Sequence, residues 1–135
     1  MSMKKHIVCI DDDPQVLTTI RLVLERGGFQ VTMAPGGRQG LEAIRQLKPD
    51  LVVLDLMMPE MDGWEVFQQV KIDDALKHIP FVIFTAKGGS IDRTIGLKIA
   101  KVDAYLTKPL SPQVLLQTIR QVLEAKADKA VDGGL

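Results

Sequence analysis

Side chains suited to phosphoryl transfer occur at four separate places in the sequence. They are the acidic run Asp11-Asp12-Asp13, the single Asp55, Thr85 and Lys108. Each place follows a short apolar run that predicts a buried strand, and open α/β sheets put their functional sites at the carboxyl ends of parallel strands. Carboxylates there could hold a divalent cation and accept a phosphoryl group, while a hydroxyl and an ammonium could bind the phosphoryl oxygens.

The acidic groups are predicted to lie close enough to repel one another. Adjacent parallel strands are about 4.8 Å apart, so Asp12 and Asp55 should lie within a few ångströms of each other. Two charges about 5 Å apart repel by about 3 kcal/mol at an effective dielectric of about 20. Such a cluster either raises its pKa values or binds a cation. Mg²⁺ suits this set, and the backbone carbonyl of Met57 is a further candidate ligand. Taken alone, the acidic run is equally consistent with a solvated turn in which Asp13 caps a helix.

Short apolar runs alternate with longer segments of helical periodicity, which predicts an α/β fold. Strands are expected near 6–10, 30–34, 51–54, 81–84 and 103–106, and helices near 14–26, 37–47, 63–73, 90–101 and 112–126. The runs at 51–54 and 81–84 are apolar throughout, as a parallel sheet covered on both faces requires. Strand–helix–strand alternation with short connections implies right-handed crossovers. We therefore predict a flavodoxin-like, doubly wound (βα)5 domain whose five-stranded parallel sheet has the order 2-1-3-4-5.

Composition and charge narrow the class of protein. The 135 residues include 17 Lys+Arg and 17 Asp+Glu, which gives a formal net charge of zero. Such a chain lacks the strong basic excess with which proteins neutralise nucleic-acid phosphates. Cys9 is the one cysteine, so no internal disulfide can form. No apolar segment approaches the length of a membrane span, and the basic start is a poor signal peptide. We predict a cytoplasmic protein that binds neither nucleic acid nor a membrane directly.

Four motifs in this order closely resemble the receiver domain of two-component response regulators. They are Val8-Cys9-Ile10-Asp11-Asp12-Asp13-Pro14, Val53-Leu54-Asp55-Leu56-Met57-Met58-Pro59-Glu60-Met61-Asp62-Gly63, Phe84-Thr85-Ala86-Lys87 and Asp103-Ala104-Tyr105-Leu106-Thr107-Lys108-Pro109-Leu110. The resemblance covers residues 5–126, which leaves 127–135 as a flexible tail or the start of a linker. Each motif is weak by itself, whereas all four at family-like spacing are specific.

The resemblance implies a chemical role for each matching position. Asp55 would accept a phosphoryl group from the phosphohistidine of a sensor histidine kinase or a histidine phosphotransfer protein. Asp12 would bind Mg²⁺ directly, and Asp11 mostly through water. Thr85 would engage the phosphoryl group, and Lys108 would pair with it after a cis peptide bond to proline. The domain would then be no enzyme in the usual sense, since it catalyses only its own phosphorylation and dephosphorylation.

The resemblance also implies how the signal leaves the site. Thr85 would be drawn toward the phosphoryl group, and Tyr105 would rotate inward as the switch aromatic. The face made by the fourth helix, the fifth strand and the fifth helix would then change its affinity for an unknown downstream protein, or would form a phosphorylation-dependent homodimer. No effector domain is seen after residue 126, so we expect either a stand-alone regulator or a receiver from a larger protein. Met57 and Lys87 are expected to tune the phosphoryl lifetime.

Some positions depart from the family pattern, and two other classes of protein fit the site residues less well. Lys101-Val102 stands where Gly-Ala is common, and Leu110 where phenylalanine is frequent. A haloacid-dehalogenase-like phosphohydrolase would need an acid–base aspartate where Met57 stands. A flavodoxin-like nucleotide or flavin binder would need glycine or hydroxyl groups in the first loop, where three aspartates would repel phosphate. The departures concern the output face, and both rival classes are disfavoured by residues of the site itself.

Overall fold

The computed structural model describes residues 4–86, 102–109 and 111–133, with only the backbone for Ala86 and for residues 129–133. The helix expected near 90–101 lies outside the described residues. Lys87, Lys101 and Leu110, which were named above, also lie outside the described residues.

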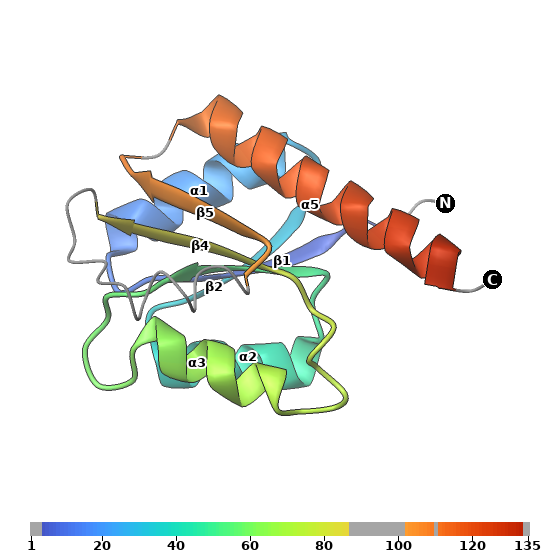
Figure 1. Cartoon of the computed structure of the whole chain (residues 1–135). Coiled ribbons are helices and arrows are strands. Elements are labelled where there is room, and N and C mark those ends of the chain that lie inside the picture. Colours follow the sequence, from blue (N-terminus) through green and yellow to red (C-terminus); the bar gives the residue numbers. More distant parts are fainter. Residues whose placement is uncertain (1–3, 87–101, 110, 134–135) are drawn as a thin grey trace.

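A parallel sheet forms the centre of the domain (Figure 1). Its strands are β1 (His6–Ile10), β2 (Gln30–Ala34), β3 (Leu51–Asp55), β4 (Phe81–Ala86) and β5 (Ala104–Lys108). They form one 5-stranded sheet in the order β2-β1-β3-β4-β5, with every pair parallel. This confirms the predicted flavodoxin-like order, in which the direction of winding changes between β1 and β3.

Helices cover both faces of the sheet. The described helices are α1 (Pro14–Arg26), α2 (Gly37–Leu47), α3 (Gly63–Lys71) and α5 (Pro112–Gly133). Figure 1 shows α1 and α5 on one face and α2 with α3 on the other. A hydrophobic core lies between the sheet and the helices on each face, and strand β1 contributes to both cores. Ile7 and Cys9 pack in the core beneath α1 and α5, whereas Val8 and Ile10 pack in the core beneath α2 and α3. None of the described helices is both long and apolar enough to span a membrane.

Local sequence explains where three of the helices begin. Asp13 accepts a hydrogen bond from the backbone N–H of Gln15 at 2.9 Å, and Pro14 follows as the first helical residue. Asp62 caps α3 through the backbone N–H of Glu65 at 3.0 Å. Ser111 accepts a longer bond of 3.4 Å from Val114 at the start of α5. The predicted cap at Asp13 is therefore confirmed.

Several strands and helices end at other residues than the sequence predicted. Asp55, Thr85 and Lys108 lie within the strands instead of following them, because backbone pairing continues past the apolar run. Helix α3 ends at Lys71 rather than near residue 73. Helix α5 continues to Gly133, whereas an end near 126 was expected. The sequence after Lys126 has no apolar repeat, but its alanines and lysines favour helix on their own.

Candidate phosphoryl-transfer site

Strand register brings the predicted residues to one edge of the sheet. Asp11 directly follows β1, and Asp55 is the last residue of β3. Asp55 pairs with Phe84 of β4, so Thr85 stands one residue beyond it. Lys108 pairs with Ala86 at the end of β5. The sheet therefore gathers at its carboxyl edge the residues that the sequence singled out.

Lys108 bridges two buried carboxylates. Its Nζ lies 3.1 Å from Asp11 Oδ2 and 3.5 Å from Asp55 Oδ2. Asp11 is 0% exposed and Asp55 is 2% exposed, whereas the Lys108 side chain retains 25% exposure. Lys108 Nζ also lies 4.9 Å from the centroid of the Phe84 ring. The Lys108 ammonium therefore lies inside the site and within cation–π distance of an aromatic ring.

Burial perturbs the ionisation of all three groups. Burial, followed by the charge of Asp11, raises the pKa of Asp55 to about 6. Burial also raises the pKa of Asp11, against the opposing hydrogen bonds from the Asp13 backbone and Lys108. Burial disfavours the charge of Lys108, but its bond to Asp11 and the charges of both carboxylates outweigh burial and raise its pKa. The site therefore holds two aspartates that resist ionisation beside one lysine that stays charged.

The donor set fits a small divalent cation. Asp11, Asp12 and Asp55 each offer a carboxylate oxygen, and these oxygens lie within 4.8 Å of one another. Asp11 Oδ1 accepts the Asp13 N–H at 2.8 Å, and the buried Oδ2 has the Lys108 ammonium, at 3.1 Å, as its one polar contact among the described residues. Asp11 Oδ2 therefore has lone pairs available for a cation, and the exposed carboxylate of Asp12 lies beside it. Mg²⁺ favours such a set of carboxylate oxygens that also leaves room for water ligands.

Three further predicted residues lie around this centre. Thr85 is 3% exposed on β4. Met57 lies in the loop after β3, where its N–H donates to Asp55 Oδ1 at 3.1 Å and its side chain is 67% exposed. Tyr105 on β5 is half-buried and packs against the core under α2 and α3. The Lys108–Pro109 peptide bond is cis, as the resemblance implied. Lys87 lies outside the described residues, so its predicted role stays a prediction.

The two histidines and the cysteine lie away from the candidate site. His6 Nε2 lies 2.7 Å from Thr32 Oγ1 within the sheet. Cys9 is fully buried, and burial raises the pKa of its thiol far above the ordinary value, which leaves it unreactive. His78 is exposed in a turn after α3. Sequence reasoning gave none of them a chemical role, and none lies at the carboxyl edge.

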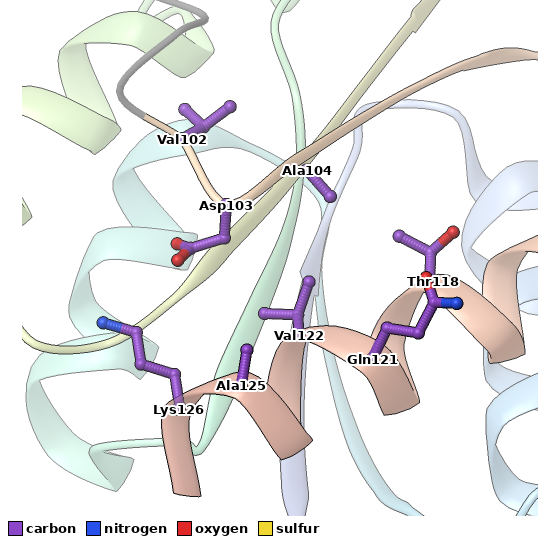
Figure 2. Close-up of a pocket in the computed structure, with 8 residues that line it drawn as sticks. All are labelled: Val102, Asp103, Ala104, Thr118, Gln121, Val122, Ala125 and Lys126. Carbon is purple, nitrogen blue, oxygen red and sulfur yellow. The ribbon is translucent and has the colours of Figure 1, made fainter. Parts of the chain in front are cut away.

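A separate pocket lies at the other edge of the sheet. It has a volume of about 390 Å³ and lies between the start of β5 and helix α5. Figure 2 shows Asp103 and Lys126 at one end of this pocket, with their charged groups pointing the same way, and Val122 and Thr118 along its wall. The pocket is lined by none of the phosphoryl-transfer residues, so it is separate from the candidate site.

Known proteins match this arrangement along most of the chain. The family model described as the response regulator receiver domain matches residues 7–120. The DNA-binding response regulator MtrA of Mycolicibacterium smegmatis is 35% identical over 131 residues, which are 97% of this chain and 56% of that protein. The alkaline phosphatase synthesis transcriptional regulatory protein PhoP of Bacillus subtilis is 36% identical over 121 residues, 90% of this chain and 49% of that protein. The chain thus spans about half the length of these curated relatives.

Solved structures show the same similarity in three dimensions. A response regulator receiver domain protein from Clostridium thermocellum has a TM-score of 0.81 and 27% identity, covering 91% of this chain and 97% of that one. A CheY-like response regulator receiver domain protein from Methanospirillum hungatei JF-1 has a TM-score of 0.84 and 26% identity, covering 94% of this chain and 99% of that one.

Proposed function

Because this chain belongs to the family of response regulator receiver domains, we propose that it is a phosphorylation-activated switch of a two-component system with Asp55 as phosphoacceptor. The donor is the phosphohistidine of a sensor histidine kinase or of a histidine phosphotransfer protein. One observation carries the assignment: Asp55 is buried at the carboxyl edge between Asp11 and Lys108, with its Oδ2 3.5 Å from the lysine Nζ.

The reaction requires an ionised Asp55. A carboxylate oxygen attacks phosphorus, a P–O bond forms and the P–N bond to the donor histidine breaks. The P–N bonding pair goes to the departing imidazole nitrogen, which takes a proton from solvent water. With a pKa of about 6, Asp55 is largely ionised at pH 7 and yet remains more basic than an ordinary aspartate.

The neighbouring groups neutralise charge during this transfer. Lys108 donates to the phosphoryl oxygens, and Thr85 supplies a hydroxyl from the adjoining strand. Asp11, Asp12, Asp55 and the Met57 carbonyl would hold Mg²⁺, which when bound supplies positive charge to the phosphoryl oxygens. The carboxylates would bring the ion to the edge where the phosphoryl group arrives. The protein is no enzyme toward other substrates, and catalyses only its own phosphorylation and dephosphorylation.

The output is a change in a protein-binding surface. The new group brings about −1.5 to −2 charges to a site that already contains several carboxylates. Thr85 moves toward it, Tyr105 turns further into the core, and the surface beside β5 and α5 alters. The partner is a downstream protein or a second copy of this chain, and the neutral charge of the chain disfavours direct binding to nucleic acid.

Phosphorylation of an Asp55→Asn variant tests the assignment. Wild type incubated with acetyl phosphate and Mg²⁺ should gain one phosphoryl group by intact-mass spectrometry, and the adduct should be lost in mild base. Asp55→Asn should gain none, because an amide cannot form the acyl phosphate. Asp103→Asn is the matched control, since it makes the same change at the opposite edge of the sheet and should leave phosphorylation intact. A base-labile adduct of equal yield on Asp55→Asn would refute the assignment.

A further inference from the structure

The loop that joins the phosphoacceptor strand to α3 is held between two glycines. This β3–α3 loop comprises residues 56–62. Gly37 is the first residue of α2 and Gly63 is the first residue of α3, and both are buried. The two helices contact each other, and Figure 1 shows them on the same face of the sheet.

Each glycine lies so close to the backbone of the loop, or of Asp55 just before it, that a side chain would not fit. A Cβ at Gly37 would lie 2.4 Å from the carbonyl oxygen of Met61. A Cβ at Gly63 would lie 2.4 Å from the carbonyl oxygen of Asp55 and 2.8 Å from the Cα of Leu56. Among the described glycines only Gly28 has a positive φ, so these two positions require glycine for space and not for conformation.

The loop itself has one closely defined shape. The Gly63 N–H donates to the Leu56 carbonyl at 3.1 Å, and Met57 N–H donates to Asp55 Oδ1 at 3.1 Å. Glu60 has a φ of 67°, a left-handed conformation that is unfavourable for a residue with a side chain. Such a conformation persists only where the surroundings determine it. The close contacts of Gly37 with Met61 and of Gly63 with Asp55 fix the loop at both of its ends, and so hold Glu60 in this conformation.

We propose that Gly37 and Gly63 are positioning residues for phosphoryl transfer. By letting α2 and α3 approach the β3–α3 loop without an intervening side chain, they fix the Asp55 carboxylate and the Met57 carbonyl relative to Asp11 and Lys108. The role rests on the proposed function, because it concerns the same reaction. Gly37 is separated from Asp55 in sequence and belongs to none of the four motifs.

An added methyl group gives a measurable displacement. Carbon and carbonyl oxygen normally approach to about 3.4 Å, so the backbone must move by about 1 Å at either position. A displacement of about 1 Å in a reacting group can slow a reaction by about a hundredfold. Gly37→Ala and Gly63→Ala should therefore slow phosphorylation by acetyl phosphate about tenfold or more. They should also raise the Mg²⁺ concentration that gives half the maximal rate.

Two other glycines provide matched controls. At Gly36, next to Gly37, a Cβ would meet only the mobile end of Gln39, with Oε1 at 2.8 Å. At Gly27 it would meet the Leu116 Cδ2 at 2.5 Å, between α1 and α5 at the other edge of the sheet. Gly36→Ala should react like wild type. Gly27→Ala should lower the melting temperature but leave the Mg²⁺ dependence unchanged.

The outcomes separate this proposal from the proposed function. Rates are compared at a temperature where circular dichroism shows each variant folded, with trimethylamine N-oxide added for any variant that is not, since it favours the folded state. Wild-type rates and Mg²⁺ dependence in Gly37→Ala and Gly63→Ala would overturn the positioning role. Changes no larger than those of Gly27→Ala would do the same, because they would reflect stability alone. A wild type that acquires no phosphoryl group would instead remove the proposed function.

Discussion

The two edges of the sheet use the same side chains in opposite ways. At the amino edge, Asp50 precedes β3 and Asp103 precedes β5. Asp50 Oδ2 accepts the His6 N–H at 2.7 Å, while its own N–H donates to the His6 carbonyl at 2.8 Å. Asp103 repeats the pair with Phe81, at 2.9 Å and 3.1 Å. Each aspartate therefore caps the first residue of the neighbouring strand with two hydrogen bonds.

The lysines of the two edges differ in the same manner. Lys71 Nζ donates to the carbonyls of Lys77 and Ile79 at 3.0 Å each, and lies 5.3 Å from the centroid of the Phe81 ring. Burial lowers the pKa of Lys71, although the charge of Asp103 partly offsets this. Lys108 instead faces two buried carboxylates and has a raised pKa.

This difference separates structural charge from functional charge. At the amino edge the polar groups have backbone partners that a folded chain always provides. At the carboxyl edge the aspartates face each other, and their ionised forms are disfavoured until a cation or a chemical change arrives. The carboxyl edge should therefore lose stability when its groups ionise, whereas the amino edge should lose stability when its groups are removed.

The largest expected effect is a pH dependence that comes from Asp55. An aspartate with a raised pKa binds more protons when folded, so its contribution to stability falls as pH rises from its ordinary 3.8 to about 6. That difference in pKa corresponds to at most about 3 kcal/mol. In urea denaturation without Mg²⁺, the free energy of unfolding of wild type should fall across this window relative to Asp55→Asn. If the difference between the two proteins is the same at pH 4 and pH 7, the carboxyl edge is not electrostatically strained.

Removing Asp103 should have the opposite sign. Asp103→Ala leaves the N–H of the fully buried Phe81 without its acceptor, which should cost about 1–3 kcal/mol of unfolding free energy at pH 7. Asp103→Asn keeps an acceptor oxygen and should cost less. Asp55→Asn under the same conditions should stabilise the metal-free protein. An Asp103→Asn loss as large as that of alanine would show that charge, and not the strand cap, is what matters at the amino edge.

Mg²⁺ should act only at the carboxyl edge. At ten times its dissociation constant the ion should raise the free energy of unfolding of wild type by about 1.4 kcal/mol. Asp12→Ala should lose most of this gain, because Asp12 is the exposed member of the carboxylate cluster. Asp13→Ala should keep the gain but lose about 1 kcal/mol at every Mg²⁺ concentration, since Asp13 caps α1. A melting series that shows the reverse order would reassign the acidic run.

Sequence predicted the carboxyl edge better than the amino edge, for a physical reason. Asp55, Thr85 and Lys108 follow apolar runs, and parallel strands necessarily bring such positions together. The sequence placed Asp12 within a few ångströms of Asp55, which the carboxylate cluster bears out, but which of Asp11 and Asp12 is buried depends on the direction in which each side chain points. The caps made by Asp50 and Asp103 depend on strand register, which a single segment does not encode.

The close contacts that Gly37 and Gly63 make with the β3–α3 loop could not be predicted from the sequence either. Gly63 belongs to one of the four motifs, whereas Gly37 belongs to none. The need for glycine at residue 37 arises only when α2 packs against a loop from elsewhere in the chain, which the local sequence does not show. Helix α5 extends to Gly133, past its predicted end near 126, because that end was set by apolar periodicity, which fades after Lys126. Amphipathic patterns report burial, and the last part of this helix does not need burial to form.

The smallest effect concerns how long the phosphoryl group lasts. Met57 is 67% exposed beside Asp55, so its side chain is placed to flank an incoming water without orienting it. Met57→Asn supplies an amide that can orient water, and should shorten the lifetime of the acyl phosphate several-fold, about 1 kcal/mol in the barrier. Adding Lys87→Glu should shorten it further, because a carboxylate two residues after Thr85 can accept a proton from that water.

Met57→Leu is the control, since it keeps an apolar side chain of similar size and should decay like wild type. Decay is followed by intact-mass spectrometry after acetyl phosphate is removed. Equal lifetimes for wild type, Met57→Asn and the double variant would mean that water reaches the phosphoryl group by a path these two side chains do not border, and the slow step would then have to be sought at Lys108 and Thr85.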